Sequence, residues 1–166
     1  MNDITIVDFK PDHQPYFERL NRNWIEKYFT MEEMDNYILQ HPGDAIIKQG
    51  GAILIALHEG NVVGCVALRK TGDKVFEFTK MAVDETYRRK GIAEKLSYAS
   101  FKKATELGAK EVFLFSNSIL KPAIALYEKL GFTHVPLGDV KYKRSNVKMS
   151  IDVAGFNKQQ ILSLVK

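Results

Sequence analysis

Apolar and polar residues alternate near both ends of the chain, a pattern that predicts two half-buried β-strands. In residues 2–9, Ile4 and Ile6 stand among polar neighbours, and in residues 147–153 every second side chain is apolar, starting at Val147. Successive side chains of a strand point to opposite faces of a sheet. Each strand is therefore expected to place one apolar face on a core.

Four further apolar runs predict the middle of a sheet. The runs 52–58, 61–69 and 74–83 are rich in β-branched and aromatic residues, and Glu59 and Gly60 supply a hairpin turn between the first two. These three strands are expected to be antiparallel. The short run 112–115 is apolar on both faces, which is typical of a central strand with a parallel neighbour.

Helical spacing separates these strands. Apolar positions recur every three or four residues from Phe17 to Tyr28 and from Ile92 to Leu107, and a short helix is expected at 31–40. Gly108 is placed to end the second helix in a left-handed conformation, and an early proline and a late glycine frame a further helix at 122–131. The order predicts an α+β fold: a mixed, mostly antiparallel central sheet flanked by helices, with one parallel β-α-β crossover at its centre.

Length and composition indicate one domain. The chain has 166 residues, 45% of them hydrophobic, so a single domain over residues 1–166 is expected. The longest apolar run, 52–57, is far shorter than the roughly 20 residues of a membrane span, and the N-terminus carries acids where a signal peptide has cations. The single cysteine, Cys65, excludes an internal disulfide framework. We expect a soluble, unprocessed, cytoplasmic protein without membrane partners.

The charge pattern favours small anions over nucleic acid. The net charge is +4, but the cations are scattered along the chain, and no motif interleaves basic and aromatic residues for base stacking. An unrelated basic α+β domain that binds RNA is therefore the weakest of the functions considered. The four histidines have no metal-ligand spacing and no cysteine partner, so no metal is predicted. They are His13, His41, His58 and His134.

A basic turn at the predicted start of a helix is the main candidate for an anion site. The segment 87–93 has the sequence YRRKGIA, in which Arg88, Arg89 and Lys90 precede Gly91. A helix start offers unpaired N–H groups and the positive end of the helix dipole, and glycine lets the backbone approach an anion closely. The glycine patterns of dinucleotide and nucleoside-triphosphate loops are absent. A basic turn that only caps an ordinary helix remains an alternative.

Four segments together resemble the acetyl-coenzyme A signature of the GNAT superfamily of N-acetyltransferases. They are KMAVD at 80–84, R-x-x-G-x-A at 88–93, FLFSN at 113–117 and PAIALYEKLGF at 122–132, within a match over roughly 51–153. The resemblance implies that the backbone at 88–93 holds the coenzyme A pyrophosphate. It also implies that residues 81–83 pair with the pantetheine arm, where the fourth and fifth strands splay apart. The cofactor-binding residues expected from it are Met81, Ala82, Val83, Arg88, Arg89, Lys90, Gly91, Ile92, Ala93, Asn117, Ala123 and Tyr127.

The same resemblance supplies candidates for catalysis. Transfer of an acetyl group from a thioester to an amine needs a neutral amine, a polarised carbonyl and a proton for the departing thiolate. In the family, a tyrosine at the position of Tyr127 is the usual general acid, and the strand of Glu77 often carries the general base. Period-two alternation puts Glu77 on the same face as Thr79 and Met81, and partial burial would raise its pKa.

Each of these roles has a structural alternative. Tyr127 is equally able to pack on the coenzyme without donating a proton. Glu77 is equally able to form an ion pair with a nearby cation such as Arg69 or Lys80. Asn117 suits a hydrogen bond to the coenzyme or an ordinary helix cap.

The acceptor site is the least specified part of the sequence. Trp24 and Tyr28 lie on helices that form one wall of the acceptor cleft in the family, although they also fit a core stripe. Arg144 and Asn146, before the last strand, are candidates to bind an acceptor carboxylate, with solvated charge as the alternative. Residues 155–166 contain an apolar pattern that suggests a short helix packed on the body or on a second subunit, so a homodimer is compatible with the sequence.

The function expected from all of this is transfer of the acetyl group of acetyl-CoA to a primary amine. The acceptor would be a small molecule, an amino acid or a peptide that attacks the thioester directly. The alternative is a non-catalytic acyl-CoA-binding sensor or interaction module, which would not need Tyr127 and Glu77.

Overall fold

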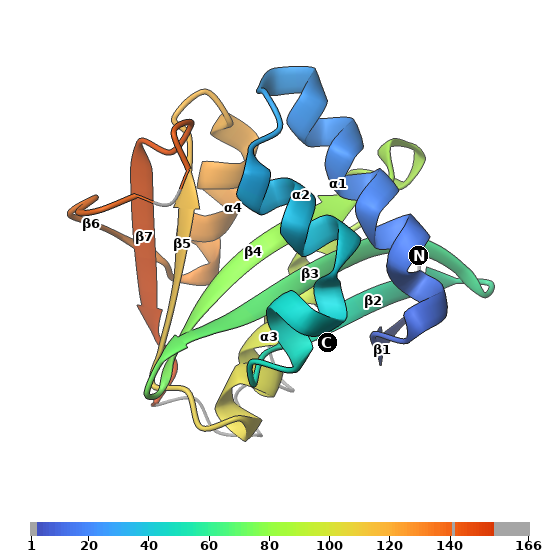
Figure 1. Cartoon of the computed structure of the whole chain (residues 1–166), viewed down its shortest axis with the longest axis horizontal. Helices are drawn as coiled ribbons and strands as arrows, with labels where there is room; N and C mark the ends of the chain where they lie inside the picture. The colour runs from blue at the N-terminus through green and yellow to red at the C-terminus, as the bar shows by residue number, and fades with distance from the viewer. Residues whose placement is uncertain (1–2, 141, 155–166) are drawn as a thin grey trace.

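A computed structural model of the chain describes residues 3–140 and 142–154 and contains one seven-stranded sheet (Figure 1). The strand order is β1-β2-β3-β4-β5-β7-β6, and every neighbouring pair is antiparallel except β4 and β5. The predicted α+β fold is confirmed. The strands are β1 (Ile4–Asp8), β2 (Ala52–His58), β3 (Asn61–Gly72), β4 (Val75–Val83), β5 (Glu111–Ser116), β6 (Thr133–Val135) and β7 (Val147–Asp152).

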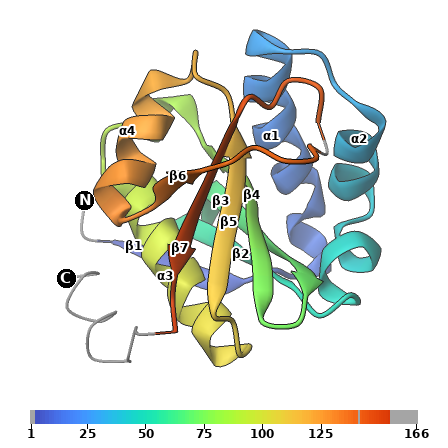
Figure 2. The same cartoon turned by 90° about the vertical axis from the view of Figure 1, so that its left-hand side faces the viewer.

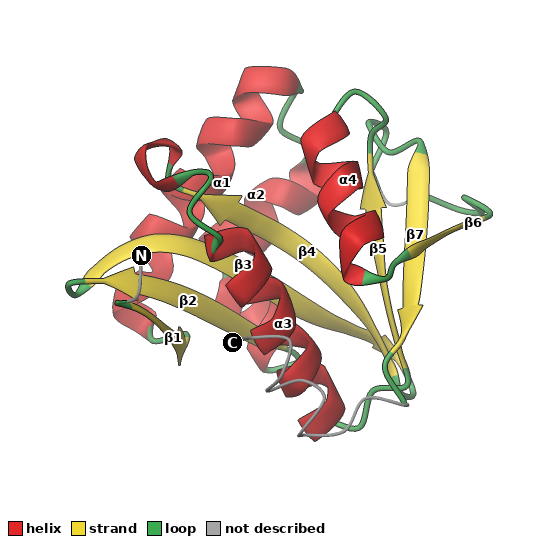
Figure 3. Cartoon of the chain, turned by 180° about the vertical axis from the view of Figure 1, so that it is seen from behind, coloured by secondary structure: helices red, strands yellow, loops and turns green. Residues whose placement is uncertain are grey.

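Helices cover both faces of the sheet. On one face lie α1 (Gln14–Tyr28) and α2 (Glu33–Gln40), and on the other lie α3 (Ile92–Glu106) and α4 (Lys121–Leu130) (Figures 1 and 3). Three short helical segments complete the described chain: η1 (Pro11–His13), η2 (Gly43–Ile47) and η3 (Glu85–Tyr87). Gly108 and Gly131 have φ angles of 88° and 107°, so α3 and α4 end in the left-handed conformation that the sequence predicts.

Each layer has its own apolar core. Phe17, Ile38 and Ile55 are buried between the sheet and the layer of α1 and α2. Leu96 and Phe101 of α3 are buried with strand residues on the opposite face. The two cores fix the helices on both sides of β4, the strand that runs through the middle of the sheet.

The parallel strands β4 and β5 separate after a short paired stretch. Their register covers only Val75 with Glu111, Phe76 with Val112 and Glu77 with Phe113. Beyond these pairs the two strands diverge, and α4 lies over the gap (Figure 3). The splayed pair that the sequence predicts is therefore present.

A β-bulge in β4 reverses the alternation of its side chains. Cys65 pairs with Ala82 and Ala67 pairs with Thr79, so β4 carries one more residue than β3 between these positions. Lys80 has a φ of 55° at this point. Met81 consequently packs in the core on the α3 side, and the prediction that Glu77, Thr79 and Met81 share one face is wrong for Met81.

Some features of the described chain have no counterpart in the sequence pattern. Strand β6 is only three residues long, and the helical segment η2 lies in the connection between α2 and β2. The predicted C-terminal helix with Ile161, Leu164 and Val165 lies outside the described residues. Within residues 3–140 and 142–154, no helix combines the length and the apolar character needed to cross a membrane.

Candidate active site

An open groove of about 460 Å³ lies where β4, the start of α3 and α4 meet. It contains most of the residues that the sequence predicts for the cofactor. Its lining is Trp24, Met81, Ala82, Val83, Tyr87, Arg88, Arg89, Gly91, Ile92, Ala93, Glu94, Pro122, Ala123, Leu126 and Tyr127. Of the predicted cofactor residues, Lys90 and Asn117 are outside this lining.

The backbone at the end of the groove has the geometry of an anion cradle. Gly91 is the N-cap of α3 and has a φ of 78°, and Arg89 also has a positive φ of 63°. The N–H groups of the first helical turn, which begins at Ile92, have no acceptor within the helix. Asp84 orders the preceding loop by accepting hydrogen bonds from Thr86 N at 2.9 Å and Thr86 Oγ1 at 2.7 Å. These features suit a phosphate group at the start of α3.

A second, narrower cavity of about 70 Å³ lies between the splayed strands. Trp24, Met81 and Tyr127 line both cavities, so the groove and this inner pocket meet at these three side chains. The complete lining of the inner pocket is Trp24, Phe29, Glu77, Phe78, Thr79, Lys80, Met81, Leu114, Phe115, Ser116, Asn117, Leu120, Tyr127, Tyr142, Arg144 and Ser145.

Tyr127 is held at the junction by aromatic packing. Its ring centroid lies 5.8 Å from that of Phe78 and 5.9 Å from that of Phe132, both in edge-on arrangements. No residue of the described chain forms a hydrogen bond with the Tyr127 hydroxyl. Burial raises the pKa of Tyr127 to about 12, so the hydroxyl keeps its proton at neutral pH. A protonated hydroxyl beside both cavities is suited to donate a proton to a ligand that bridges them.

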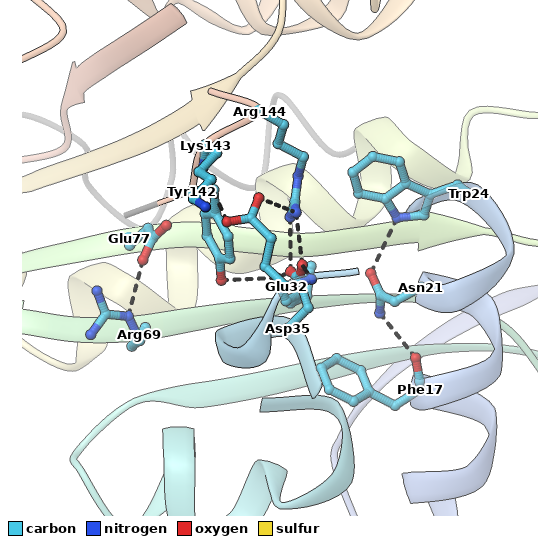
Figure 4. Close-up of polar contacts among 11 residues, drawn as sticks. Phe17, Asn21, Trp24, Glu32, Asp35, Arg69, Glu77, Tyr142, Lys143 and Arg144 are labelled. Atoms are coloured by element: carbon cyan, nitrogen blue, oxygen red, sulfur yellow. Dashed lines mark hydrogen bonds and ion pairs between the residues drawn. The ribbon is translucent and has the colours of Figure 1, made fainter. Parts of the chain in front are cut away.

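Glu77 lines the inner pocket from β4 and is almost fully buried, with 1% of its surface exposed. Its Oε1 accepts a hydrogen bond from Arg69 Nε at 3.0 Å (Figure 4). The ion pair that the sequence left as an alternative is thus present. The pair does not exclude proton transfer, because the carboxylate also borders the cavity.

Asp35, on α2, is the centre of a buried ionic cluster behind the inner pocket. Its carboxylate is fully buried and accepts hydrogen bonds from Lys80 Nζ at 2.6 Å and from Arg144 Nη1 and Nη2 at 2.7 and 2.8 Å. Arg144 Nη1 also lies 3.3 Å from Glu32 Oε2. Figure 4 shows Arg144 facing both carboxylates, and Figure 2 shows the connection between β6 and β7 extending toward α2.

The cluster changes the protonation of its members. Burial alone would raise the pKa of Asp35, but the hydrogen bonds from Arg144 and Lys80 lower it to about 2. Burial lowers the pKa of Lys80, and the negative charge of Asp35 opposes that change. The Tyr142 ring contacts both cations, with Lys80 Nζ 4.5 Å and Arg144 Cζ 4.3 Å from its centroid.

The predicted acceptor residues are divided between the inner pocket and the surface. Trp24 and Arg144 line the pocket, and the Trp24 indole donates a hydrogen bond to buried Asn21 Oδ1 at 3.3 Å. Tyr28 and Asn146 lie outside both cavities: Tyr28 packs against Phe29, and Asn146 hydrogen-bonds to Ser118.

Asn117, predicted for the cofactor, lines the inner pocket and orders its own loop. Its amide donates to Arg144 O at 2.6 Å and accepts from Ile119 N at 2.9 Å. The first bond ties the residue after β5 to the segment before β7, and the second closes the turn before α4, whose N-cap is Leu120, so neither bond makes Asn117 the cap of a helix.

The prediction of no metal is not tested by this structure. Asp3, His58 and Glu59 bring three potential ligand atoms within 4.8 Å of one another at the β1–β2 edge. None of the three lines the groove or the inner pocket. His58 already lies 2.8 Å from Asp3 Oδ2 and 3.0 Å from the Tyr87 hydroxyl.

A splayed parallel strand pair, a basic helix start and a tyrosine at the junction of two cavities thus lie together in the described chain. The sequence profile of the acetyltransferase (GNAT) family matches residues 8–132. The chain belongs to this family.

Individual relatives agree with the family assignment. The chain is 38% identical over 91 residues to the uncharacterised N-acetyltransferase YjgM of Escherichia coli, a match that covers 53% of this chain and 54% of that protein. It is 31% identical over 127 residues to human N-acetylaspartate synthetase, covering 75% of this chain and 40% of the relative. The chain therefore spans about half or less of the length of these curated relatives.

A solved structure supports the fold at low sequence identity. The GNAT-family acetyltransferase of Staphylococcus aureus superposes with a TM-score of 0.83 at 19% identity, covering 90% of this chain and 99% of that one.

Proposed function

We propose that the protein is an acetyl-CoA-dependent N-acetyltransferase that acts on a primary amine of a small molecule, an amino acid or a peptide. The observation that carries this proposal is the meeting of two cavities at Trp24, Met81 and Tyr127. One cavity is open and ends at a basic helix start, and the other is narrow and lined by charged groups. A two-substrate transfer needs such an arrangement, because the reacting atoms of both substrates must come together away from bulk water.

The residues of the groove fit coenzyme A. Gly91 and the first turn of α3 would bind the pyrophosphate, with Arg88 and Arg89 adding positive charge. The strand edge at 81–83 faces the groove and would pair with the pantetheine amides. Bound acetyl-CoA would supply a thioester as the acetyl donor, and its reactive end would reach the junction beside Tyr127.

Glu77 of the inner pocket and Tyr127 of the junction are assigned to proton transfer. Glu77 accepts a proton from the acceptor ammonium, directly or through water, so that the neutral amine attacks the carbonyl carbon. As the carbon–nitrogen bond forms and the carbon–sulfur bond breaks, Tyr127 donates its hydroxyl proton to the departing sulfur. The nitrogen then releases its second proton, directly or through water, to the Tyr127 phenolate, and Glu77 returns its proton to solvent, so both side chains are regenerated. Burial raises the pKa of Tyr127, and the same surroundings would increase the basicity of a thiolate leaving next to it.

The alternative function is an acyl-CoA-binding module without catalysis. Both functions predict binding of coenzyme A, whereas the enzyme alone releases the thiol in the presence of an amine. The distinguishing experiment incubates the protein with acetyl-CoA and a panel of amino acids, polyamines, aminoglycosides and peptides, and measures free thiol. Calorimetric binding of coenzyme A without amine-dependent thiol release would support the binding module and contradict the enzyme.

A further inference from the structure

Lys80 is an unusual residue for the wall of a small cavity. Its side chain is 2% exposed, and the β4 bulge directs it to the α2 side of the sheet, into the lining of the inner pocket. Lysine is rarely buried to this extent unless its charge is paired. Asp35 provides that pair from behind the cavity, because Asp35 is fully buried and is not part of the pocket lining.

The hydrogen-bonding capacity of Lys80 is not filled by the described residues. An ammonium group has three N–H donors. Asp35 Oδ1 accepts one at 2.6 Å and the Tyr142 hydroxyl accepts another at 3.0 Å. Within residues 3–140 and 142–154, no third acceptor contacts Lys80 Nζ. Buried donors are nearly always satisfied, so the third N–H suits an acceptor atom of a ligand in the pocket.

Arg144 is less available to a ligand than its charge suggests. Both of its terminal nitrogens donate to Asp35, and Nη1 also contacts Glu32. These bonds hold the guanidinium in a bidentate ion pair with Asp35. They use three of its five N–H donors, so both cations of the pocket lining keep a donor, and Lys80 is the more deeply buried of the two, with 2% of its side chain exposed against 13% for Arg144.

The charges around the cavity favour a ligand that carries both signs. Lys80 and Arg144 carry two positive charges, and their two partners, Asp35 and Glu32, are not part of the pocket lining. On this side of the pocket the charged groups that border the cavity are therefore the cations. Glu77, in the same lining, supplies a carboxylate. A second cation near Lys80 would be repelled, whereas a carboxylate would be attracted.

We propose that Lys80 is the specificity-determining residue of the acceptor site and binds the carboxylate of an amino-acid acceptor whose amine lies toward Glu77. Asp35 is the positioning residue that holds Lys80 in place. This inference rests on the proposed acetyltransferase function and narrows its acceptor to amines that carry a nearby carboxylate. Simple alkylamines and polyamines lack the group that Lys80 recognises.

The test compares acceptors that differ only in the carboxylate. With saturating acetyl-CoA, kcat/KM is measured for L-amino acids and for the amines formed by removing their α-carboxylate. The parent protein is expected to prefer the amino acid by about 10- to 100-fold, the range of a hydrogen bond to a charged group. In Lys80→Met, which keeps an unbranched apolar side chain, this preference should disappear, because kcat/KM falls for the amino acid and not for the amine without a carboxylate.

A matched control is Lys70→Met, which makes the same chemical change at an exposed position of β3 and retains the parent preference. Folding of Lys80→Met is verified by its affinity for coenzyme A.

A second measurement uses the parent protein alone. An acid that lacks the amine, such as propionate in place of alanine, should inhibit the parent competitively against the acceptor. Propionamide, which lacks the carboxylate, should not inhibit.

Two results separate the possible failures. Thiol release by the parent with equal kcat/KM for both members of each pair, or an unchanged preference in Lys80→Met, would overturn the role of Lys80 alone. Absence of thiol release with every acceptor would overturn this inference together with the proposed function.

Discussion

Replacing Asp35 with asparagine tests the buried cluster through the stability of the fold. Asparagine keeps the size of the side chain and an oxygen that accepts from Glu32 N, now 3.0 Å from Asp35 Oδ2. The substitution removes the negative charge between Lys80 and Arg144. Buried Lys80 then loses the counter-charge of Asp35 and Arg144 keeps only Glu32, while the apolar packing around α2 is unchanged.

The size of the effect follows from the burial and the pKa of Asp35. Removing one partner of a buried ion pair costs about 3–5 kcal/mol. The lowering of the Asp35 pKa from its ordinary value of 3.8 to about 2 corresponds independently to about 2.4 kcal/mol of stability at neutral pH. We expect Asp35→Asn to lower the free energy of unfolding at pH 7 by about 2–5 kcal/mol.

The pH dependence has a definite sign. Because the folded protein lowers the pKa of Asp35, the stabilisation is present above pH 4 and is lost as the pH falls through about 2. In acid the parent therefore loses the stabilisation that comes from ionised Asp35, whereas Asp35→Asn lacks this stabilisation at every pH. The difference between the two should shrink by about 1 kcal/mol between pH 7 and pH 3.

Urea unfolding followed by circular dichroism at both pH values measures this difference. The control is Asp44→Asn, which breaks an exposed pair with Lys48 whose side chains are both more than half exposed, and it should leave the unfolding midpoint unchanged. A loss below about 1 kcal/mol at pH 7, or a difference that grows in acid, would refute the assignment of Asp35 as a stabilising ionised group.

Two further substitutions test the cofactor groove and the proposed base. Gly91→Asp should abolish binding of coenzyme A in calorimetry, because it adds a carboxylate to the anion cradle. The control is Gly60→Asp, which places aspartate at a similar positive φ of 80° in the open hairpin turn and should retain binding. Equal affinities of the two variants for coenzyme A would contradict the assignment of the cradle. Glu77→Gln should reduce kcat/KM most at low pH, where free amine is scarce, and progressively less as rising pH deprotonates the acceptor in solution. A pH profile of Glu77→Gln parallel to that of the parent would contradict the role of Glu77 as the base.

The parts of the structure that depend on local periodicity could be predicted from the sequence. The spacing of apolar residues predicts the strands and the main helices, and glycines and turn residues predict where these elements begin and end. All of these signals depend on residues only a few positions apart. Most residues that line the groove could be predicted because they belong to two short contiguous motifs, 81–83 and 88–93.

The acceptor side depends on contacts that no local pattern encodes. Asp35 meets Lys80 across 45 positions of sequence and Arg144 across 109 positions. The β4 bulge also turns Lys80 toward α2, where strict alternation would have placed Met81. Lys80 shares β4 with only two other polar residues, Glu77 and Thr79, and its place in the strand gave no indication of its partner.

The proposed transfer is tested most directly by the turnover of Tyr127→Phe. This substitution removes the hydroxyl at the junction of the two cavities and keeps the ring that packs on Phe78 and Phe132. With an accepted amine, we expect kcat to fall about 100-fold or more while the affinity for coenzyme A stays within a few-fold. Tyr16→Phe, on the outer side of α1, serves as the control with parent activity. Parent-like kcat in Tyr127→Phe would contradict the account, because another group would then protonate the departing thiolate.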